Sequence, residues 1–323
     1  MQDTFGRNID YLRISVTEAC NFRCTYCTPD GHGRLSTPPL TVEEIERIVR
    51  AAVALGMTNI RLTGGEPLLR RDIIEIVRAI LMIEDVRDLA LTTNGFFLTR
   101  YAQPLADAGL RRINISLDTL QRGRFAEISG MDAFEQVWGG IGAAEEAGFA
   151  PLKINVVLLR GLNDDQVADL ANLTIERAWH VRFIELMPVG SSEAAREFFA
   201  KRFIPASEIR ARLPQLVAIA SPRGNGPART YRLPNARGTI GFITPTSEHF
   251  CGTCNRIRIM PNGEARSCLF GGNGVDLRSA LCKGADESSL QQLLAQAICA
   301  KPLHHPWGKE FRIVAGAMSE IGG

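Results

Sequence analysis

The sequence predicts an α/β protein in which a parallel sheet covered by helices is followed by a smaller C-terminal α+β domain. In the first two-thirds of the chain, six short apolar or β-branched runs alternate with helical patterns. Strands that are each followed by a helix pair in parallel through right-handed crossovers. The alternation stops after about Pro188, and 323 residues allow two domains of ~150 residues each. We therefore expect residues 1–190 to form the sheet domain and residues 191–323 the second domain.

Each strand and helix of the first domain has its own local signal. The expected strands are, in chain order, Leu12–Val16, Asn59–Thr63, Leu89–Thr92, Arg112–Ser116, Leu152–Leu158 and Val181–Glu185. The first helix should begin at Thr41, which forms a capping-box pair with Glu44, and end at Gly56. The other helices are expected at Asp72–Ile83, Thr99–Ala108, Ala133–Ala147 and Asp164–Ala178. Such units build either a doubly wound sheet or a partial barrel, and in both folds ligands bind at the carboxyl ends of the strands.

The second domain mixes helices, short strands and turns, and the chain contains no internal repeat. The elements expected here are a helix at Ser191–Arg202, a Pro-, Gly- and Arg-rich stretch at Ser221–Gly238, strands at Thr239–Ile243 and Arg256–Met260, a turn at Gly271–Gly274, and helices at Leu277–Cys282 and Ser288–Ala300.

Composition excludes several classes of protein. Hydrophobic residues make up 45% and charged residues 22% of the chain, which is typical of a globular enzyme and not of a disordered or fibrous protein. The net charge of +2 is too small for the whole molecule to hold a nucleic acid, so an anion site must be a local cluster. No apolar run approaches the ~18 residues of a membrane span, and the first residues lack a signal-peptide core. We expect a cytoplasmic protein with neither a membrane nor a nucleic acid as partner.

The first group of cysteines, Cys20, Cys24 and Cys27, directly follows the first expected strand. In a cytosolic chain, such close spacing favours a metal centre over disulfides. Three thiolates suit an iron–sulfur cluster, which normally takes four, so one iron would be left open to a ligand from outside the protein. Structural zinc is the alternative, but zinc needs a fourth ligand, for which the nearest candidate is His32.

The second group of cysteines is again a triplet, Cys251, Cys254 and Cys268. One interpretation is a zinc knuckle completed by His249 or Cys282. The other is a second iron–sulfur cluster whose open iron binds a substrate atom directly.

Other conspicuous residues have ordinary structural interpretations. Cys282 and Cys299 lie in apolar helical patterns, so we expect them to be buried small hydrophobes. His304 and His305 are expected in a surface loop, and the pair Asp164–Asp165 at a helix N-terminus.

The first triplet has the spacing CxxxCxxC with an aromatic residue, Tyr26, before its last cysteine, and Gly64–Pro67 (Gly-Gly-Glu-Pro) follows the second strand. This combination resembles the radical S-adenosylmethionine (SAM) superfamily. The resemblance implies a partial (β/α)6 barrel of the TIM type. It also implies that the open iron chelates SAM, whose cleavage gives a 5′-deoxyadenosyl radical. Glycines at the turn would allow close approach of the backbone to the SAM amino group.

Further motifs extend over nearly the whole chain. They are Tyr11–Ser15, Arg61–Pro67, Thr92–Gly95, Asn114–Asp118, Arg182–Gly190, Phe250–Arg258 and the terminal Ile321–Gly323. Together with the two triplets they resemble the GTP 3′,8-cyclase family of molybdenum cofactor biosynthesis. The chain has Thr28 before Pro29 where that family usually has Met, but this position is not a ligand.

The resemblance implies a role for each matching position. Two [4Fe–4S] clusters would be held by Cys20, Cys24 and Cys27 and by Cys251, Cys254 and Cys268. SAM would be contacted by Tyr26, Gly65, Ser116 and Met187. GTP would be held by Arg13, Arg61, Thr92, Lys153, Arg256, Ile257 and Arg258, with its guanine edge on the open iron of the second cluster. The catalytic tail would be Gly322 and Gly323.

The chemistry of the arginine side chain agrees with the implied binding of the GTP phosphates. The planar guanidinium of Arg suits bidentate contacts with phosphate. Arg256 and Arg258 are alternate residues of one expected strand, so they share a face. Because Arg far outnumbers Lys in this chain, a single Arg at any one position carries little weight.

The implied reaction is removal of the C3′ hydrogen of GTP by the deoxyadenosyl radical, followed by bonding of C3′ to C8 and a one-electron reduction, giving 3′,8-cyclo-7,8-dihydro-GTP. The implied partners are a reductant protein of unknown identity, a pterin-forming enzyme downstream, and a second copy of the chain in a homodimer. Two other classes stay open: a radical SAM enzyme that modifies a peptide, and a non-enzymatic iron–sulfur carrier or zinc-stabilised binding protein.

Overall fold

The computed structural model describes residues 1–28, 30, 38–220, 226–270, 274–305 and 318. The predicted α/β class is confirmed. The strands are β1 Tyr11–Ser15, β2 Asn59–Thr63, β3 Asp88–Thr93, β4 Arg112–Ser116, β5 Lys153–Leu158, β6 His180–Glu185, β7 Val217–Ala218, β8 Arg229–Arg232, β9 Thr239–Ile243, β10 Arg256–Ile259, β11 Glu264–Arg266 and β12 Val275–Asp276. The α-helices are α1 Val42–Ala54, α2 Ile73–Leu81, α3 Leu98–Asp107, α4 Arg122–Ser129, α5 Phe134–Glu146, α6 Val167–Glu176, α7 Glu193–Arg202, α8 Ala206–Ala211, α9 Arg278–Cys282 and α10 Glu287–Cys299.

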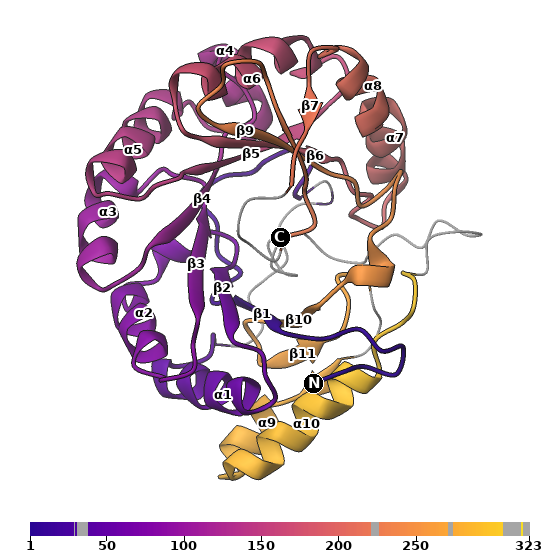
Figure 1. Cartoon of the computed structure of the whole chain (residues 1–323). Coiled ribbons are helices and arrows are strands. Elements are labelled where there is room, and N and C mark those ends of the chain that lie inside the picture. The colour runs from indigo at the N-terminus through magenta and orange to yellow at the C-terminus, as the bar shows by residue number, and fades with distance from the viewer. Residues whose placement is uncertain (29, 31–37, 221–225, 271–273, 306–317, 319–323) are drawn as a thin grey trace.

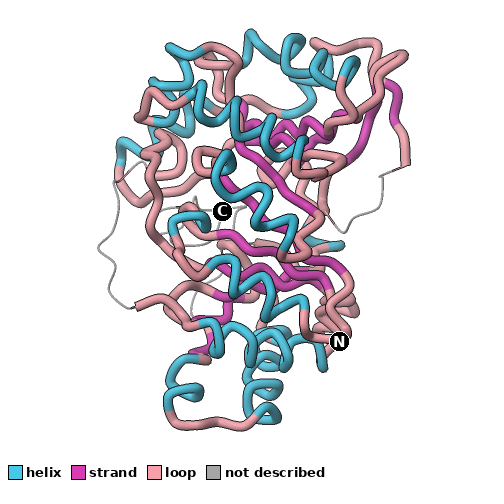
Figure 2. Tube along the Cα trace, turned by 90° about the vertical axis from the view of Figure 1, so that its left-hand side faces the viewer, coloured by secondary structure: helices cyan, strands magenta, loops and turns pink. Residues whose placement is uncertain are grey.

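All these strands belong to one sheet with the order β12-β11-β10-β1-β2-β3-β4-β5-β6-β9-β8-β7. From β10 through β1–β6 to β9 the pairing is parallel, and antiparallel strands extend both ends. The sheet curves, and helices α1–α6 cover its outer side (Figure 1). Seen from the side of α3 and α5, the helices pass in front of the strands (Figure 2). This is the arrangement expected of repeated strand–helix units.

The two faces of the sheet differ in polarity because successive side chains of a strand point in opposite directions. In β1, Leu12 and Ile14 are buried in the core, while Arg13 points to the other face. β2 repeats the pattern with Ile60 and Leu62 around Arg61. A parallel sheet is normally apolar on both faces. A polar inner face therefore indicates a ligand site inside the curve.

The first helix begins as predicted. The backbone N–H of Glu44 donates to Thr41 Oγ1 (3.2 Å), and the N–H of Thr41 donates to Glu44 Oε2 (2.8 Å), which completes the capping box. The helix then buries Ile45, Ile48 and Val49 against the sheet side of the molecule.

Several local expectations were wrong or incomplete. The stretch Ser221–Gly238 contains strand β8, and helices α4 and α8 were not predicted because their apolar patterns are short. The thiols of Cys282 and Cys299 are exposed, since α9 and α10 bury the opposite sides of these helices through residues such as Leu281 and Leu294.

His305 was expected in a surface loop but is buried at 8% exposure, packed against His249 and Phe270, whereas His304 is exposed as expected. The pair Asp164–Asp165 opens a short 3-10 turn before α6, in agreement with the sequence. Within the described residues, no helix has the length and apolar character needed to cross a membrane.

Candidate active site

One cavity inside the curve of the sheet, of about 320 Å³, is lined by both cysteine triplets. This volume is in the range of ligand-binding pockets. Its wall also contains residues from the inner faces of the parallel strands and from the loops at their carboxyl ends. The ligand site therefore lies where a parallel α/β fold places one.

The turn after β2 positions the first triplet. The N–H of Gly65 donates to the Thr17 carbonyl (2.7 Å), and the N–H of Glu66 donates to the Ala19 carbonyl (2.7 Å). A Cβ on Gly65 would lie 2.3 Å from the Ala19 oxygen, so only glycine fits. Because these two amides are used by the chain itself, the turn has its carbonyl oxygens to offer to a ligand ammonium group.

Glu66 connects this turn to the end of β3. Its carboxylate is fully buried and accepts hydrogen bonds from Thr93 Oγ1 (2.7 Å), the Asn94 N–H (2.7 Å) and the Leu68 N–H (3.0 Å). Burial raises the pKa of Glu66 to about 7 despite these donors. The side chain of Asn94 then donates to Asn21 Oδ1 (2.8 Å), within the loop of the first triplet.

Tyr26 and Asp118 form a buried pair beside the first triplet. Tyr26 Oη donates to Asp118 Oδ2 (2.8 Å), and the other carboxylate oxygen accepts from the Val157 N–H (2.8 Å). Burial raises the pKa of Asp118 to about 6 and that of Tyr26 well above its ordinary value. The residues expected to contact SAM line the same cavity; they are Tyr26, Gly65, Ser116 and Met187.

A row of arginines crosses the inner face of the sheet on the neighbouring strands β10, β1 and β2. Arg13 of β1 lies in register with Arg61 of β2 on one side and Arg258 of β10 on the other. Burial, followed by repulsion from Arg258 and Arg61, lowers the pKa of Arg13 well below its ordinary value. Burial and Arg256 lower that of Arg258 to about 10. Buried like charges on neighbouring strands destabilise one another, so the row favours an anionic ligand.

Arg182 of β6 belongs to this site although the sequence analysis gave it no role. It lines the cavity, and its Nη1 reaches Asn114 Oδ1 at 3.5 Å. Burial and Arg61 lower its pKa to about 9. The missed signal was the alternation of β6, in which buried Val181 and Phe183 flank an inward-facing Arg.

Charge in the cavity wall is strongly one-sided. Six cationic side chains line its described part: Arg13, Arg61, Arg182, Arg256, Arg258 and Lys301. The carboxylates there are Asp118, paired with Tyr26, and Glu185. Glu185 is occupied by the N–H groups of Ala206 (2.8 Å), Thr246 (3.1 Å) and Ser247 (2.9 Å). The described wall therefore carries an excess of positive charge, which favours an anionic ligand.

Two residues expected to hold GTP do not line this cavity. Lys153 is buried next to it, where burial and Arg182 lower its pKa to about 6. Ile257 lies in the hydrophobic core, on the opposite face of β10 from Arg256 and Arg258. Their fellow candidate Thr92 does line the cavity.

The second triplet lies at the other end of the strands from the first. Cys251 and Cys254 precede β10, whereas the first triplet follows β1, and these two strands are parallel. Cys268 follows β11, which is antiparallel to β10 and so ends near Cys254. The two triplets thus face each other across the length of the strands, with the arginine row between them.

The pKa shifts of the cysteine thiols differ between the two triplets and are in opposite directions at Cys24 and Cys254. Burial raises the pKa of the Cys24 thiol well above its ordinary value and also raises that of Cys20. Burial acts in the same direction on Cys254, but Arg256 and Lys301 outweigh it and lower the pKa of this thiol to about 7. Binding of iron to the first triplet must therefore displace protons.

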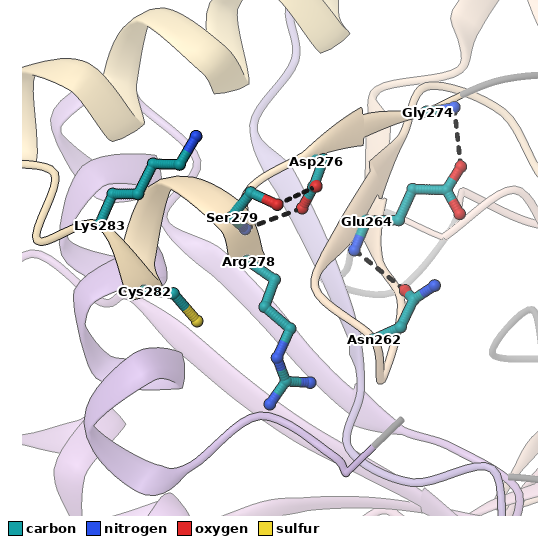
Figure 3. A pocket seen from close by; sticks show the side chains of 8 residues that line it. All are labelled: Asn262, Glu264, Gly274, Asp276, Arg278, Ser279, Cys282 and Lys283. Atoms are coloured by element: carbon teal, nitrogen blue, oxygen red, sulfur yellow. Dashed lines mark hydrogen bonds between the residues drawn. The ribbon is translucent and has the colours of Figure 1, made fainter. Parts of the chain in front are cut away.

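Of the residues considered as a fourth zinc ligand, His249 uses one ring nitrogen for contacts within the protein. Nδ1 of His249 lies 2.9 Å from the Pro245 carbonyl and 2.8 Å from Nε2 of His305. Cys282 lines a separate surface pocket between β11, β12 and α9 (Figure 3). His32, the candidate for the first triplet, lies outside the described residues.

The C-terminal segment returns to the first triplet. The N–H of Met318 donates to the Cys27 carbonyl (2.8 Å), and Met318 packs with Met187 against Met260. Gly322 and Gly323 lie outside the described residues.

Fold and site together define a radical SAM protein. The family model described as "Radical SAM superfamily" matches residues 14–174, and that described as "Molybdenum Cofactor Synthesis C" matches residues 179–307. Among solved structures, SuiB from Streptococcus suis superposes with a TM-score of 0.63 at 16% identity, covering 92% of this chain and 67% of SuiB. Its SAM-bound form superposes with a TM-score of 0.61 at 17% identity, covering 89% and 68%. At such low identity these structures support the fold alone.

Sequence comparison identifies the family within this class. A GTP 3′,8-cyclase of Pelotomaculum thermopropionicum is 48% identical over 333 residues, and one of Moorella thermoacetica is 43% identical over 332 residues. Both matches cover 100% of this chain and 100% of the relative. The chain belongs to the GTP 3′,8-cyclase family. Its radical SAM domain implies one [4Fe–4S] cluster and SAM as cofactors.

Proposed function

We propose that the protein is a radical SAM lyase that converts GTP into 3′,8-cyclo-7,8-dihydro-GTP, the first step of molybdenum cofactor biosynthesis. Family membership supports this activity. The observation that carries the proposal for the substrate is the row Arg13, Arg61 and Arg258, which lies in one cavity with the first triplet. A nucleoside triphosphate carries several negative charges, which suit a row of guanidinium groups.

The first triplet would hold the cluster through Cys20, Cys24 and Cys27, and SAM would lie against Tyr26, Gly65, Ser116 and Met187. When bound, these cofactors supply a 5′-deoxyadenosyl radical. The overall change in GTP is loss of the C3′ hydrogen, a new C3′–C8 bond, and uptake of one electron and one proton, so the product is an isomer of GTP.

The chain contributes positioning and exclusion of water. Guanidinium groups on three adjacent strands would fix the triphosphate, with Arg182 and Arg256 closing the sides. The polar wall is formed by rigid strands, and a rigid wall holds the ribose in one orientation relative to the first triplet. In this proposal Thr92 contacts the nucleotide directly, Lys153 lies on the inner face of β5 beside the cavity, and Ile257 supports the wall from behind.

A second [4Fe–4S] cluster would be held by Cys251, Cys254 and Cys268. Three thiols that line one cavity with a substrate site suit a cluster with an open iron, which would take the guanine edge of GTP. The low pKa of Cys254 favours the thiolate that iron requires.

The C-terminal glycines complete the proposed site. The support for this is Met318, which hydrogen-bonds to the loop of the first triplet and lines the cavity. We retain a homodimer, a separate reductant protein and a downstream pterin-forming enzyme as expectations of the family, and residues 1–190 and 191–323 as its two domains.

The test is an anaerobic assay of the reconstituted protein with SAM, a strong reductant, and either GTP or no nucleotide. Formation of 5′-deoxyadenosine in step with an isomer of GTP would support the proposal, and Cys27→Ala should abolish both. Deoxyadenosine without a GTP product would retain the radical chemistry and overturn the substrate, which would reopen the peptide-modifying class. Neither compound from a protein with intact clusters would overturn the proposed activity.

A further inference from the structure

Lys301 is a buried lysine that connects the two segments of the second triplet. It follows α10 and is 3% exposed. Its Nζ donates to the carbonyl oxygens of Arg256 (2.8 Å) and Ser267 (2.6 Å). Arg256 lies two residues after Cys254, and Ser267 directly precedes Cys268. One ammonium group thereby holds the backbone on both sides of the triplet.

The thiols of Cys254 and Cys268 are the groups of the second triplet that favour the charged form of this ammonium group, although burial outweighs them and lowers the pKa of Lys301. In the described residues, no carboxylate forms an ion pair with Lys301. A buried charge is costly unless an opposite charge compensates it. The thiolates of a bound cluster would provide that compensation.

The backbone around Lys301 is itself fixed to the triplet. Arg7, buried and paired with Asp3 (Nε to Oδ2, 2.6 Å), donates from Nη1 to the Cys251 carbonyl (2.8 Å) and from Nη2 to the Pro302 carbonyl (2.8 Å). The residue after Lys301 and the first cysteine of the triplet are thus held by one guanidinium group. This arrangement leaves the ammonium little freedom to move away.

We propose that Lys301 is the positioning residue and counter-charge of the second iron–sulfur cluster, anchoring its cysteine segments and raising its reduction potential. This inference rests on the proposed function, in which the second triplet holds a cluster. Reduction adds one negative charge to the cluster, and a nearby cation stabilises the reduced form more than the oxidised form. Lys301 therefore favours acceptance of an electron at the second site.

The test compares the full-length wild-type chain with Lys301→Gln, which retains hydrogen-bond donors without the charge, and with Lys301→Met, which has neither. Lys201→Met, at an exposed lysine of α7, is the matched control. After anaerobic reconstitution, iron per chain is measured, and both clusters are titrated with reductant by electron paramagnetic resonance. The first cluster is assigned by the change of its signal on addition of SAM.

We expect the Gln variant to retain both clusters while the reduction equilibrium constant of the second falls at least tenfold, equivalent to ~59 mV for one electron. The first cluster and the Lys201→Met control should be unchanged. The Met variant should lose iron from the second site, because no side chain then links the carbonyls of Arg256 and Ser267.

Wild-type potentials in a Gln variant that holds both clusters would overturn the inference alone. A wild-type protein with a cluster at the first triplet only would overturn both the inference and the second cluster on which it rests. Should the Gln variant also lose the second cluster, Lys301→Arg decides the question by restoring the charge. Recovered iron supports the inference, and unrecovered iron overturns it.

Discussion

Replacement of Arg182 by Met should stabilise the ligand-free protein and weaken its affinity for GTP. The change removes a half-buried cation whose hydrogen bond to Asn114 is long, at 3.5 Å, and retains an unbranched but shorter side chain. Burial, with repulsion from Arg61, lowers the pKa of Arg182 from the ordinary value of an arginine to about 9. At ~1.36 kcal/mol for each pKa unit, holding this charge costs the folded protein up to about 5 kcal/mol.

Only part of that free energy should be recovered, because the shorter side chain leaves unfilled space. We expect a gain of about 1–2 kcal/mol in the free energy of unfolding, or a Tm higher by about 2–6 °C. The pKa in the folded state is below that in the unfolded chain, so the cost is full below pH 9 and disappears as the pH rises toward 12.5. The gain should therefore be present at neutral pH.

In the complex the same charge is favourable. A hydrogen bond to a charged group contributes about 1.5–3 kcal/mol, so the Kd for GTP should rise about 10- to 150-fold. The assays are thermal denaturation of the ligand-free protein and anaerobic calorimetry with GTP. Arg196→Met, at an exposed arginine of α7, is the control and should change neither quantity. A destabilised Arg182 variant with unchanged affinity for GTP would refute the reasoning and make Arg182 a structural cation.

Three other changes test separate parts of the site. Gly65→Ala would place a Cβ 2.3 Å from the Ala19 oxygen, so iron analysis should show loss of the first cluster, whereas full iron content would contradict the packing argument. Burial and Arg182 lower the pKa of Lys153 from 10.5 to about 6, so between these pH values the unfolded chain binds more protons and stability rises with pH. Lys153→Met should flatten this rise of the free energy of unfolding with pH, measured by urea titration at several pH values. An unchanged pH dependence would argue against a lowered pKa of Lys153 in the folded protein. Deletion of Gly322 and Gly323 should abolish product formation while both clusters remain, and a fully active deletion would remove the tail from the mechanism.

Local signals account for the parts of the fold that the sequence predicted. Each of the six parallel strands β1–β6 is a short run with its own alternation, and the helices between them have apolar positions at helical spacing. The capping box of Thr41 and Glu44 needs only residues of a single turn. Such features depend on neighbours in the sequence, so they can be recognised without knowledge of the tertiary structure.

The parts that were missed depend on residues far apart in the chain. Lys301 follows a helix with no motif around it, and its role appears only when its Nζ meets the carbonyls of Arg256 and Ser267. His305 is buried by His249, 56 residues away. Cys282 and Cys299 are exposed because each lies on the side of its helix that faces solvent. A few apolar residues at helical spacing do not determine which side of a helix that is.

The pairing of β10 with β1 is the long-range contact that creates the site. Without it, the second triplet would have no fixed relation to the first, because about 240 residues separate Tyr11 from its partner Arg256. Parallel pairing places the residues before β10 and those after β1 at opposite ends of a strand pair. At ~3.3 Å per residue, the five residues of β1 separate these ends by ~13 Å. In the proposed function, that separation leaves room for one nucleotide, with its triphosphate at Arg13 and Arg258 in the middle of the same two strands. A single register thus sets how far apart the two cysteine triplets begin and where the arginine row lies between them.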